Sequence, residues 1–156
     1  MLKISFEVTG EKQINRAFDA AAKAFEDFTP VFKELGKRFQ SYEKQMFDTE
    51  GGISGSRWAT LSPGYRAWKS INYPGKGILE RKGTLKKSLT SPQAVHELEK
   101  LSAAYGTTVP YAIYHQKGAG NMPARKPIKL SKKERHNWTR ELHRYIKSVI
   151  EKRITA

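Results

Sequence analysis

A stripe of large apolar side chains in residues 29–48 places the strongest constraint on how this chain can fold. The stripe consists of Phe32, Leu35, Phe39, Tyr42 and Met46. Spacings of three and four residues are the repeat of one helical face. Thr29 suits the N-cap, and Pro30 suits the first helical position. We therefore expect a helix over 29–48, with its apolar face in the core or in a seam between helices.

Two further segments show the same periodicity. In residues 11–28, apolar side chains recur at helical spacing and predict a second amphipathic helix: Ile14, Phe18, Ala21, Phe25 and Phe28. Residues 132–153 predict one long helix with Trp138, Leu142, Tyr145 and Val149 facing the core and with Lys133, Arg140, Arg144 and Lys147 outside. Ser131 and Glu134 form a capping box at the start of this helix. The Ser131 hydroxyl accepts a hydrogen bond from one backbone N–H, and the Glu134 carboxylate reaches back to accept one from another.

Alternating apolar residues indicate strands. Residues 2–9 alternate strictly, and 93–99 and 101–107 predict a hairpin that turns near Lys100. The predicted fold is therefore α+β: a small antiparallel sheet packed with two N-terminal helices and one long C-terminal helix. At 156 residues the chain favours a single domain over 1–156.

Residues 49–83 form a Gly-rich loop that contains seven of the chain's twelve glycines. Loops of this length in compact domains are usually functional or disordered, and Trp58 and Trp68 argue against disorder. Ser62-Pro63 can start a short helix that carries Tyr65 and Trp68. Another short helix is expected at Thr84–Leu89.

The charge of the chain suggests an acidic partner. Its net charge is +14, and residues 51–156 carry 21 Lys/Arg against 6 Asp/Glu. A field of this sign favours DNA, RNA or an acidic protein surface, and simple solubility is the alternative. The chain has no cysteine, which excludes disulfides, a thiol nucleophile and thiolate metal ligands.

The acids and histidines do not form a catalytic pattern. The aspartates are Asp19, Asp27 and Asp48, all in the first 50 residues, and the histidines are His96, His115, His136 and His143. No spacing supplies a triad or the three or four ligands of a zinc site. Glu97 and Glu99 have no third acid nearby, and no phosphate-binding glycine motif is present. We expect no catalytic residue, no metal, no cofactor and no enzymatic activity.

Aromatic and basic residues alternate in the Gly-rich loop, where Arg57, Arg66 and Lys69 lie among the aromatics. Such patterns hold single-stranded nucleic acid by stacking, and they also anchor protein interfaces. Burial in the core is a third possibility for Trp58 and Trp68.

Residues 109–128 contain aromatics, Gly, Pro and bases but no carboxylate, which suits an interaction surface better than an acid–base site. Pro110 can begin a helix on which Tyr111, Tyr114 and His115 share a face. Arg125 suits bidentate pairing with a carboxylate or phosphate of a partner. The alternative is that His115, Gln116 and Arg125 tie this loop to the protein's own body.

Three segments, in order, resemble the phage virion morphogenesis family, the S-type tail completion proteins of Mu-like phages. The first is Trp58-Ala-Thr-Leu-Ser-Pro-Gly-Tyr65 with Lys69, and the second runs from Gly77-Ile78-Leu79 to Gly83-Thr84-Leu85-Lys-Lys-Ser88. The third is Tyr111-Ala-Ile-Tyr-His115-Gln-Lys-Gly118 followed by Met122-Pro-Ala-Arg125-Lys-Pro127.

The resemblance implies a structural protein of the virion, made in the host cytoplasm, that acts at the head–tail junction or tail end. It implies a homo-oligomeric ring that contacts neighbouring neck and tail proteins. We expect no membrane among its partners. Interface candidates are Trp58, Tyr65, Trp68, Tyr111, His115, Gln116, Met122 and Arg125. Candidates to face DNA in the channel are Lys86, Lys87, Arg140, Arg144 and Lys147. The alternative function is a basic nucleic-acid-binding protein, and the lack of clustered acids disfavours a metal-dependent nuclease.

Overall fold

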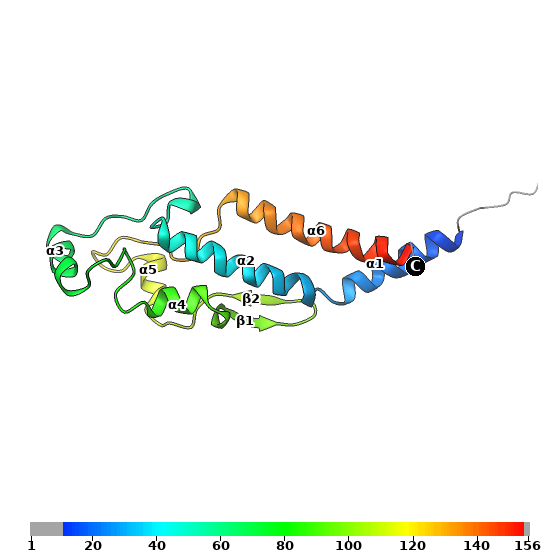
Figure 1. Ribbon diagram of the computed structural model, residues 1–156, viewed down its shortest axis with the longest axis horizontal. Helices are drawn as coiled ribbons and strands as arrows, with labels where there is room; N and C mark the ends of the chain where they lie inside the picture. The colour runs from blue at the N-terminus through cyan, green and yellow to red at the C-terminus, as the bar shows by residue number, and fades with distance from the viewer. Residues whose placement is uncertain (1–10, 155–156) are drawn as a thin grey trace, which may run out of the picture.

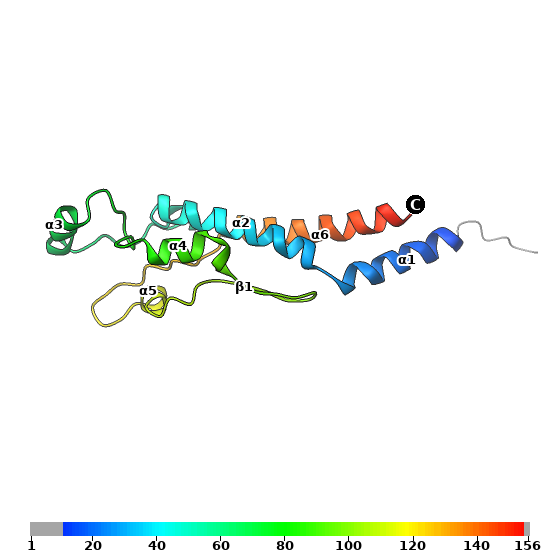
Figure 2. The same cartoon turned by 60° about the horizontal axis from the view of Figure 1, so that its bottom comes forward.

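The computed structural model describes residues 11–154 of the chain, so the strand predicted at 2–9 lies outside the described residues. The described part is elongated (Figures 1 and 2). Helices α3 and α5 lie at one end, and α1 and the C-terminal half of α6 lie at the other. The central element is α2, Thr29–Asp48, which confirms the helix predicted from the apolar stripe.

The buried face of α2 forms the centre of the core. Its buried apolar side chains are Val31, Leu35, Phe39, Tyr42, Met46 and Phe47. The helix α4, Thr84–Thr90, packs on this face with Leu85 and Leu89 and is continued by the short 3-10 turn Pro92–Ala94. The start of α2 differs from the prediction: Thr29 is the first helical residue, and the Asp27 carboxylate accepts its amide proton at 2.8 Å.

Within residues 11–154 the sheet is one antiparallel hairpin beside α2. Its strands are β1, Val95–Leu98, and β2, Ala103–Tyr105. The predicted hairpin is confirmed, with shorter strands because Pro92–Ala94 forms a 3-10 turn and a bulge interrupts the pairing between Val95 and Glu97. Tyr105 fixes the hairpin to α2, since its hydroxyl donates to Phe32 O at 2.6 Å.

The N-terminal helix packs differently from the prediction. Helix α1, Glu11–Glu26, ends two residues before the predicted 28, and its main partner is α6, Lys132–Ile154, rather than the sheet. The predicted α+β class is confirmed. The prediction that both N-terminal helices pack on the sheet is wrong, because only α2 lies against it. The strands are too short and too exposed to offer a helix an apolar face. At the junction, the Tyr145 hydroxyl of α6 donates to Asp27 O at 2.8 Å, and its ring contacts Phe28.

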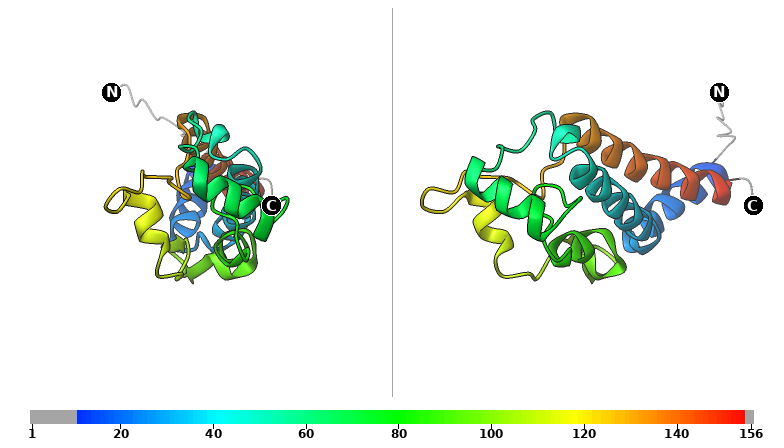
Figure 3. Two further views of the ribbon diagram at one scale, coloured as in Figure 1. Left: turned by 90° about the vertical axis from the view of Figure 1, so that its left-hand side faces the viewer. Right: turned by 60° about the vertical axis from the view of Figure 1, so that its left-hand side comes forward.

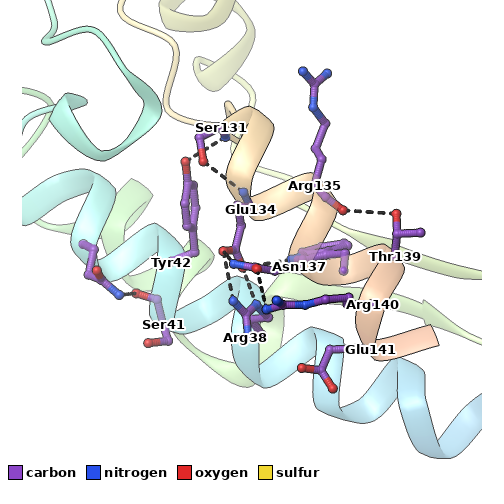
Figure 4. A network of polar contacts seen from close by, with 12 residues as sticks. Arg38, Ser41, Tyr42, Ser131, Glu134, Arg135, Asn137, Thr139, Arg140 and Glu141 are labelled. Carbon is purple, nitrogen blue, oxygen red and sulfur yellow. Dashed lines mark hydrogen bonds and ion pairs between the residues drawn. The ribbon is translucent and has the colours of Figure 1, made fainter. Parts of the chain in front are cut away.

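A polar network joins the start of α6 to α2 (Figure 4). Ser131 Oγ accepts the Glu134 amide at 3.1 Å, which confirms half of the capping box. The predicted reach-back of Glu134 is wrong. Its carboxylate instead accepts protons from Arg38, Asn137 and the Trp138 indole, while the Ser131 amide donates to the Tyr42 hydroxyl at 2.9 Å. A charged guanidinium is the stronger partner for a carboxylate.

The Gly-rich segment 49–83 contains the short turn Gly52–Ser54 and the helix α3, Pro63–Asn72, which confirms the helix predicted at Ser62-Pro63. Trp58 anchors the segment: it is buried against Phe47, and its indole N–H donates to Lys126 O at 2.9 Å. Gly51 lies against this indole with φ +90°, and a Cβ there would come within 2.7 Å of the ring. Only glycine fits both conditions.

Candidate partner-binding cleft

A cleft of about 940 Å³ lies at the end of the molecule formed by α3 and α5. Both helices stand at this end, away from the C-terminus of α6 (Figure 3). The cleft walls are α3, residues 79–85, the helix α5, Ala112–Lys117, and residues 121–125. Five predicted interface residues meet in its lining, namely Tyr65, Tyr111, His115, Met122 and Arg125.

Helix α3 presents Tyr65 and Lys69 to the cleft, four residues apart on one helical face. Tyr65 is 42% exposed, whereas Lys69 is buried and its ammonium donates to Gly77 O. Burial lowers the pKa of Lys69, although Glu80 and Glu50 counteract part of this effect. Lys69 thus holds α3 to the Gly77 loop, and Tyr65 is the side chain available to a partner.

Aromatic rings and Arg81 build the outer edge of this wall. Tyr65 stacks on Trp68 with ring centroids 5.5 Å apart, and Trp68 contacts Tyr73. The Arg81 guanidinium lies 5.7 Å from the Trp68 ring and 5.3 Å from the Tyr73 ring, and its Nε donates to the Tyr73 hydroxyl at 3.1 Å. Trp68 does not line the cleft but supports Tyr65 and Arg81. Cation–π contacts of this kind orient an exposed cation.

The floor of the cleft includes Leu79 and Leu85. Leu79 has φ +62°, an uncommon conformation for a non-glycine residue that turns the chain between Gly77 and Glu80. Glu80 is an acid in the lining, and its carboxylate accepts a hydrogen bond from the Lys86 ammonium at 2.8 Å. The same ammonium also pairs with Asp48 at 3.0 Å. Burial alone would lower the pKa of Lys86, but these hydrogen bonds outweigh it and leave the pKa raised. Lys86 is therefore engaged within the subunit.

The opposite wall carries Tyr111 and His115, whose rings meet edge to face with centroids 6.0 Å apart. Tyr111 is 43% exposed at the start of α5. His115 Nδ1 is buried without a hydrogen-bond partner among the described atoms. Burial, and then the charge of Arg125, lowers the pKa of His115, so the imidazole is neutral near pH 7.

Three predicted interface residues hold the subunit together. Arg125 is buried, and its guanidinium donates to Ala59 O at 2.6 Å and Thr60 O at 2.9 Å. The Gln116 amide pairs with both backbone groups of Ile128, accepting at 3.3 Å and donating at 2.9 Å. These contacts match the alternative in which Gln116 and Arg125 tie the loop to the protein's own body. Trp58 likewise matches the alternative of burial in the core. A contact of these three with a partner stays a prediction.

Of the basic residues predicted to face DNA, Lys86 is half-buried and paired within the subunit, and the other four are exposed. Arg144 pairs with Glu141 at 2.6 Å and Lys147 with Glu151 at 3.6 Å, whereas Arg140 bonds the neutral Asn137. Beside Lys147, a groove on the same helix is lined by the half-buried Ile146 and Ile150. Lys87 is exposed on α4. Contact of these residues with DNA stays a prediction.

Several cleft residues were not among the interface candidates chosen from the sequence: Leu61, Lys69, Leu79, Arg81 and Lys82. A helical wheel of α3 would have placed Lys69 beside Tyr65. The others come from loops whose path depends on tertiary contacts.

The arrangement suits binding rather than catalysis. The cleft combines apolar and aromatic walls with exposed cations at Arg81 and Lys82. Among residues 11–154, no group of three or more His, Asp or Glu is placed to hold a metal ion. None of the described helices is long and apolar enough to cross a membrane.

Comparison with known families gives the class of protein. Residues 10–152 match the model of the phage virion morphogenesis family. The match covers nearly the whole chain, and the chain therefore belongs to this family, whose members are structural proteins of phage assembly. No curated protein and no solved structure matches the chain.

Proposed function

We propose that this chain completes the phage tail at the head–tail junction or tail end, as a non-enzymatic subunit of a homo-oligomeric ring. Membership of the family over residues 10–152 carries this proposal. The exposed aromatic and cationic cleft supports it, because Tyr and Arg are enriched where proteins dock. Neighbouring neck and tail proteins are the proposed partners.

Deletion of the gene from a phage that encodes the chain tests the proposal. We expect electron microscopy to show DNA-filled heads and separate tails, with joining restored by the wild-type chain. The exposed cleft variant Tyr65→Ala/Tyr111→Ala should restore joining poorly, whereas Ile71→Ala, at an exposed site outside the cleft, should restore it fully. Normal joined particles without the chain, or heads that fail to fill, would contradict the proposal.

The net charge of +14 favours one second candidate, a nucleic-acid-binding protein. A free DNA binder should bind random duplexes with micromolar or tighter affinity and a steep loss of affinity with salt. Under our proposal, the isolated subunit binds DNA weakly, since Arg144 and Lys147 are paired with acids. A salt titration by fluorescence anisotropy separates the two.

A further inference from the structure

The end of the molecule opposite the cleft exposes an apolar ridge on α1. The ridge consists of Ile14, Phe18 and Phe25, which are 53%, 71% and 56% exposed. Their spacings of four and seven residues place them on one helical face, so they form a continuous strip. Exposed apolar strips of this kind mark interaction sites. Phe25 contacts Phe28 with ring centroids 6.2 Å apart, yet all three side chains stay more than half exposed beside the packing of α1 on α6.

Acidic side chains flank the α1 ridge, whereas the exposed cations of α1, Arg16 and Lys23, fall on the opposite side of the helix by its 100° repeat. Asp19 and Glu26 directly follow Phe18 and Phe25, and both are exposed. Neither forms an ion pair with any residue that the structure describes. A partner for this face therefore needs apolar walls with cations at their rim.

The cleft at the other end offers those features. Its apolar lining includes Leu61, Tyr65, Leu79, Tyr111 and Met122. Arg81 and Lys82 stand exposed at its edge, and the one acid in its lining, Glu80, is already paired with Lys86. The cleft and the α1 ridge thus complement each other in apolar character and in charge.

We propose that α1 of one copy docks in the cleft of a second copy, head to tail. Phe18 and Phe25 enter between Tyr65 and Tyr111, in the manner of a helix laid in a groove. Asp19 and Glu26 then face Arg81 and Lys82. Contact between two clefts would instead oppose cations to cations, because Arg81 and Lys82 stand exposed at the edge of each.

The two patches differ and lie at opposite ends, so each contact leaves one free ridge and one free cleft. Heterologous contacts of this type propagate, and they generate a ring where the rotation closes. The inference deepens the proposed function, on which it rests for its place in the particle, by naming the contact between subunits.

Mixing two variants tests the head-to-tail arrangement. The ridge variant Phe18→Asp/Phe25→Asp keeps its cleft, and the cleft variant Tyr111→Asp/Lys82→Glu keeps its ridge. All four sites are exposed, so circular dichroism should report folded chains. By light scattering after size exclusion, we expect each variant alone to be monomeric and an equimolar mixture to form dimers and nothing larger. Wild type and the control Ile71→Asp should form larger assemblies.

Charge exchange gives an independent check. Asp19→Lys/Glu26→Lys should weaken assembly at least tenfold, and combining it in one chain with Arg81→Glu/Lys82→Glu should restore assembly. A cleft variant that still self-associates while the ridge variant does not would overturn the inference in favour of ridge-to-ridge contact. Full assembly of both variants would also overturn the head-to-tail arrangement. So would a wild-type chain that is still monomeric at about 1 mM, the concentration at which a contact of about 4 kcal/mol is half-saturated. These outcomes leave the proposed place in the virion intact, which the deletion phenotype tests separately.

Discussion

Arg125 joins the backbone at residues 59–60 to the segment that follows α5, and we expect its loss to lower the stability of the subunit itself. In Arg125→Ala, the carbonyl groups of Ala59 and Thr60 lose charged donors, which should cost about 1–3 kcal/mol of unfolding free energy. Arg125→Lys should recover part of this, since lysine lacks the planar fork. Urea denaturation measures the difference.

Arg66 provides the matched control for Arg125. Its guanidinium also donates to a carbonyl, Leu61 O at 3.2 Å, but the residue is exposed. Arg66→Ala should change stability by less than about 0.5 kcal/mol. A stable Arg125→Ala subunit that fails only in assembly would instead favour the partner contact for Arg125.

Glu43 on α2 is fully buried, and neither of its carboxylate oxygens has a hydrogen-bond partner among the described atoms. Burial raises the pKa of Glu43 to about 8. In the unfolded chain the carboxyl returns to about 4.3, so between these values the folded state binds more protons. Unfolding free energy should therefore fall as pH rises from about 5 to about 8, by up to about 1.4 kcal/mol per pH unit.

Replacing Glu43 isolates its contribution from that of other groups. In Glu43→Leu, the unfolding free energy relative to wild type should rise steadily over the same pH range and level off above it. Glu34→Leu, at an exposed site on the same helix, should show no such trend. A difference between Glu43→Leu and wild type that does not vary with pH would show that Glu43 is ionised in the folded state.

At the scale of elements, Glu134 connects α6 to α2 through Arg38. Burial alone would raise the pKa of Glu134, but hydrogen bonds from Arg38, Asn137 and Trp138 outweigh it and lower the pKa. The network therefore adds to the unfolding free energy at pH values above the usual carboxyl pKa. This contribution is lost as the pH falls through the lowered pKa of Glu134. Glu134→Ala should destabilise by about 1–3 kcal/mol, because it leaves the partly exposed Arg38 and the indole without their acceptor.

Glu141, two turns further on in α6 and paired with exposed Arg144, is the control for Glu134. Thermal or urea unfolding of Glu141→Ala should differ from wild type by less than about 1 kcal/mol. Equal costs for the two variants would mean that the Arg38–Glu134 network does not hold the helices together.

The sequence predicted elements better than their partners. The stripe from Phe32 to Met46 and the turn near Lys100 depend on local periodicity and turn chemistry, and both helix and hairpin were confirmed. Phe18 and Phe25 show the limit. Periodicity showed that they share a face, but whether that face is buried or exposed depends on where α6 lies, which is tertiary information.

The cleft shows the same limit. Tyr65, Tyr111 and Met122 were chosen as interface candidates with the help of the family resemblance, yet only the fold brings residues 60–85 and 111–125 together. Trp58 and Arg125 have the residue types of interface anchors, and one chain alone does not reveal whether such residues face a partner or their own core. Arg81 and Lys82 were missed because their exposure depends on the path of a loop.

At the scale of the whole molecule, charge reversal on α6 tests whether the basic stripe lines a DNA channel. If it does, Arg140→Glu/Arg144→Glu should leave folding and ring formation unchanged but reduce the yield of joined, infectious particles, because weak phosphate contacts act collectively. Lys132→Glu/Lys133→Glu, at the other end of the same helix, provides a comparison of equal charge change. Fully infectious particles from the first variant would make the stripe an ordinary solvated surface.

We have proposed that this member of the virion morphogenesis family is a ring-forming subunit at the head–tail junction or tail end. The most direct measurement is a cryo-electron microscopy reconstruction of that region in a phage encoding the chain. The account predicts a closed ring of copies of this chain around the DNA path. Intact virions from which the chain is absent, or in which it occupies a site away from the junction and tail end, would contradict the account.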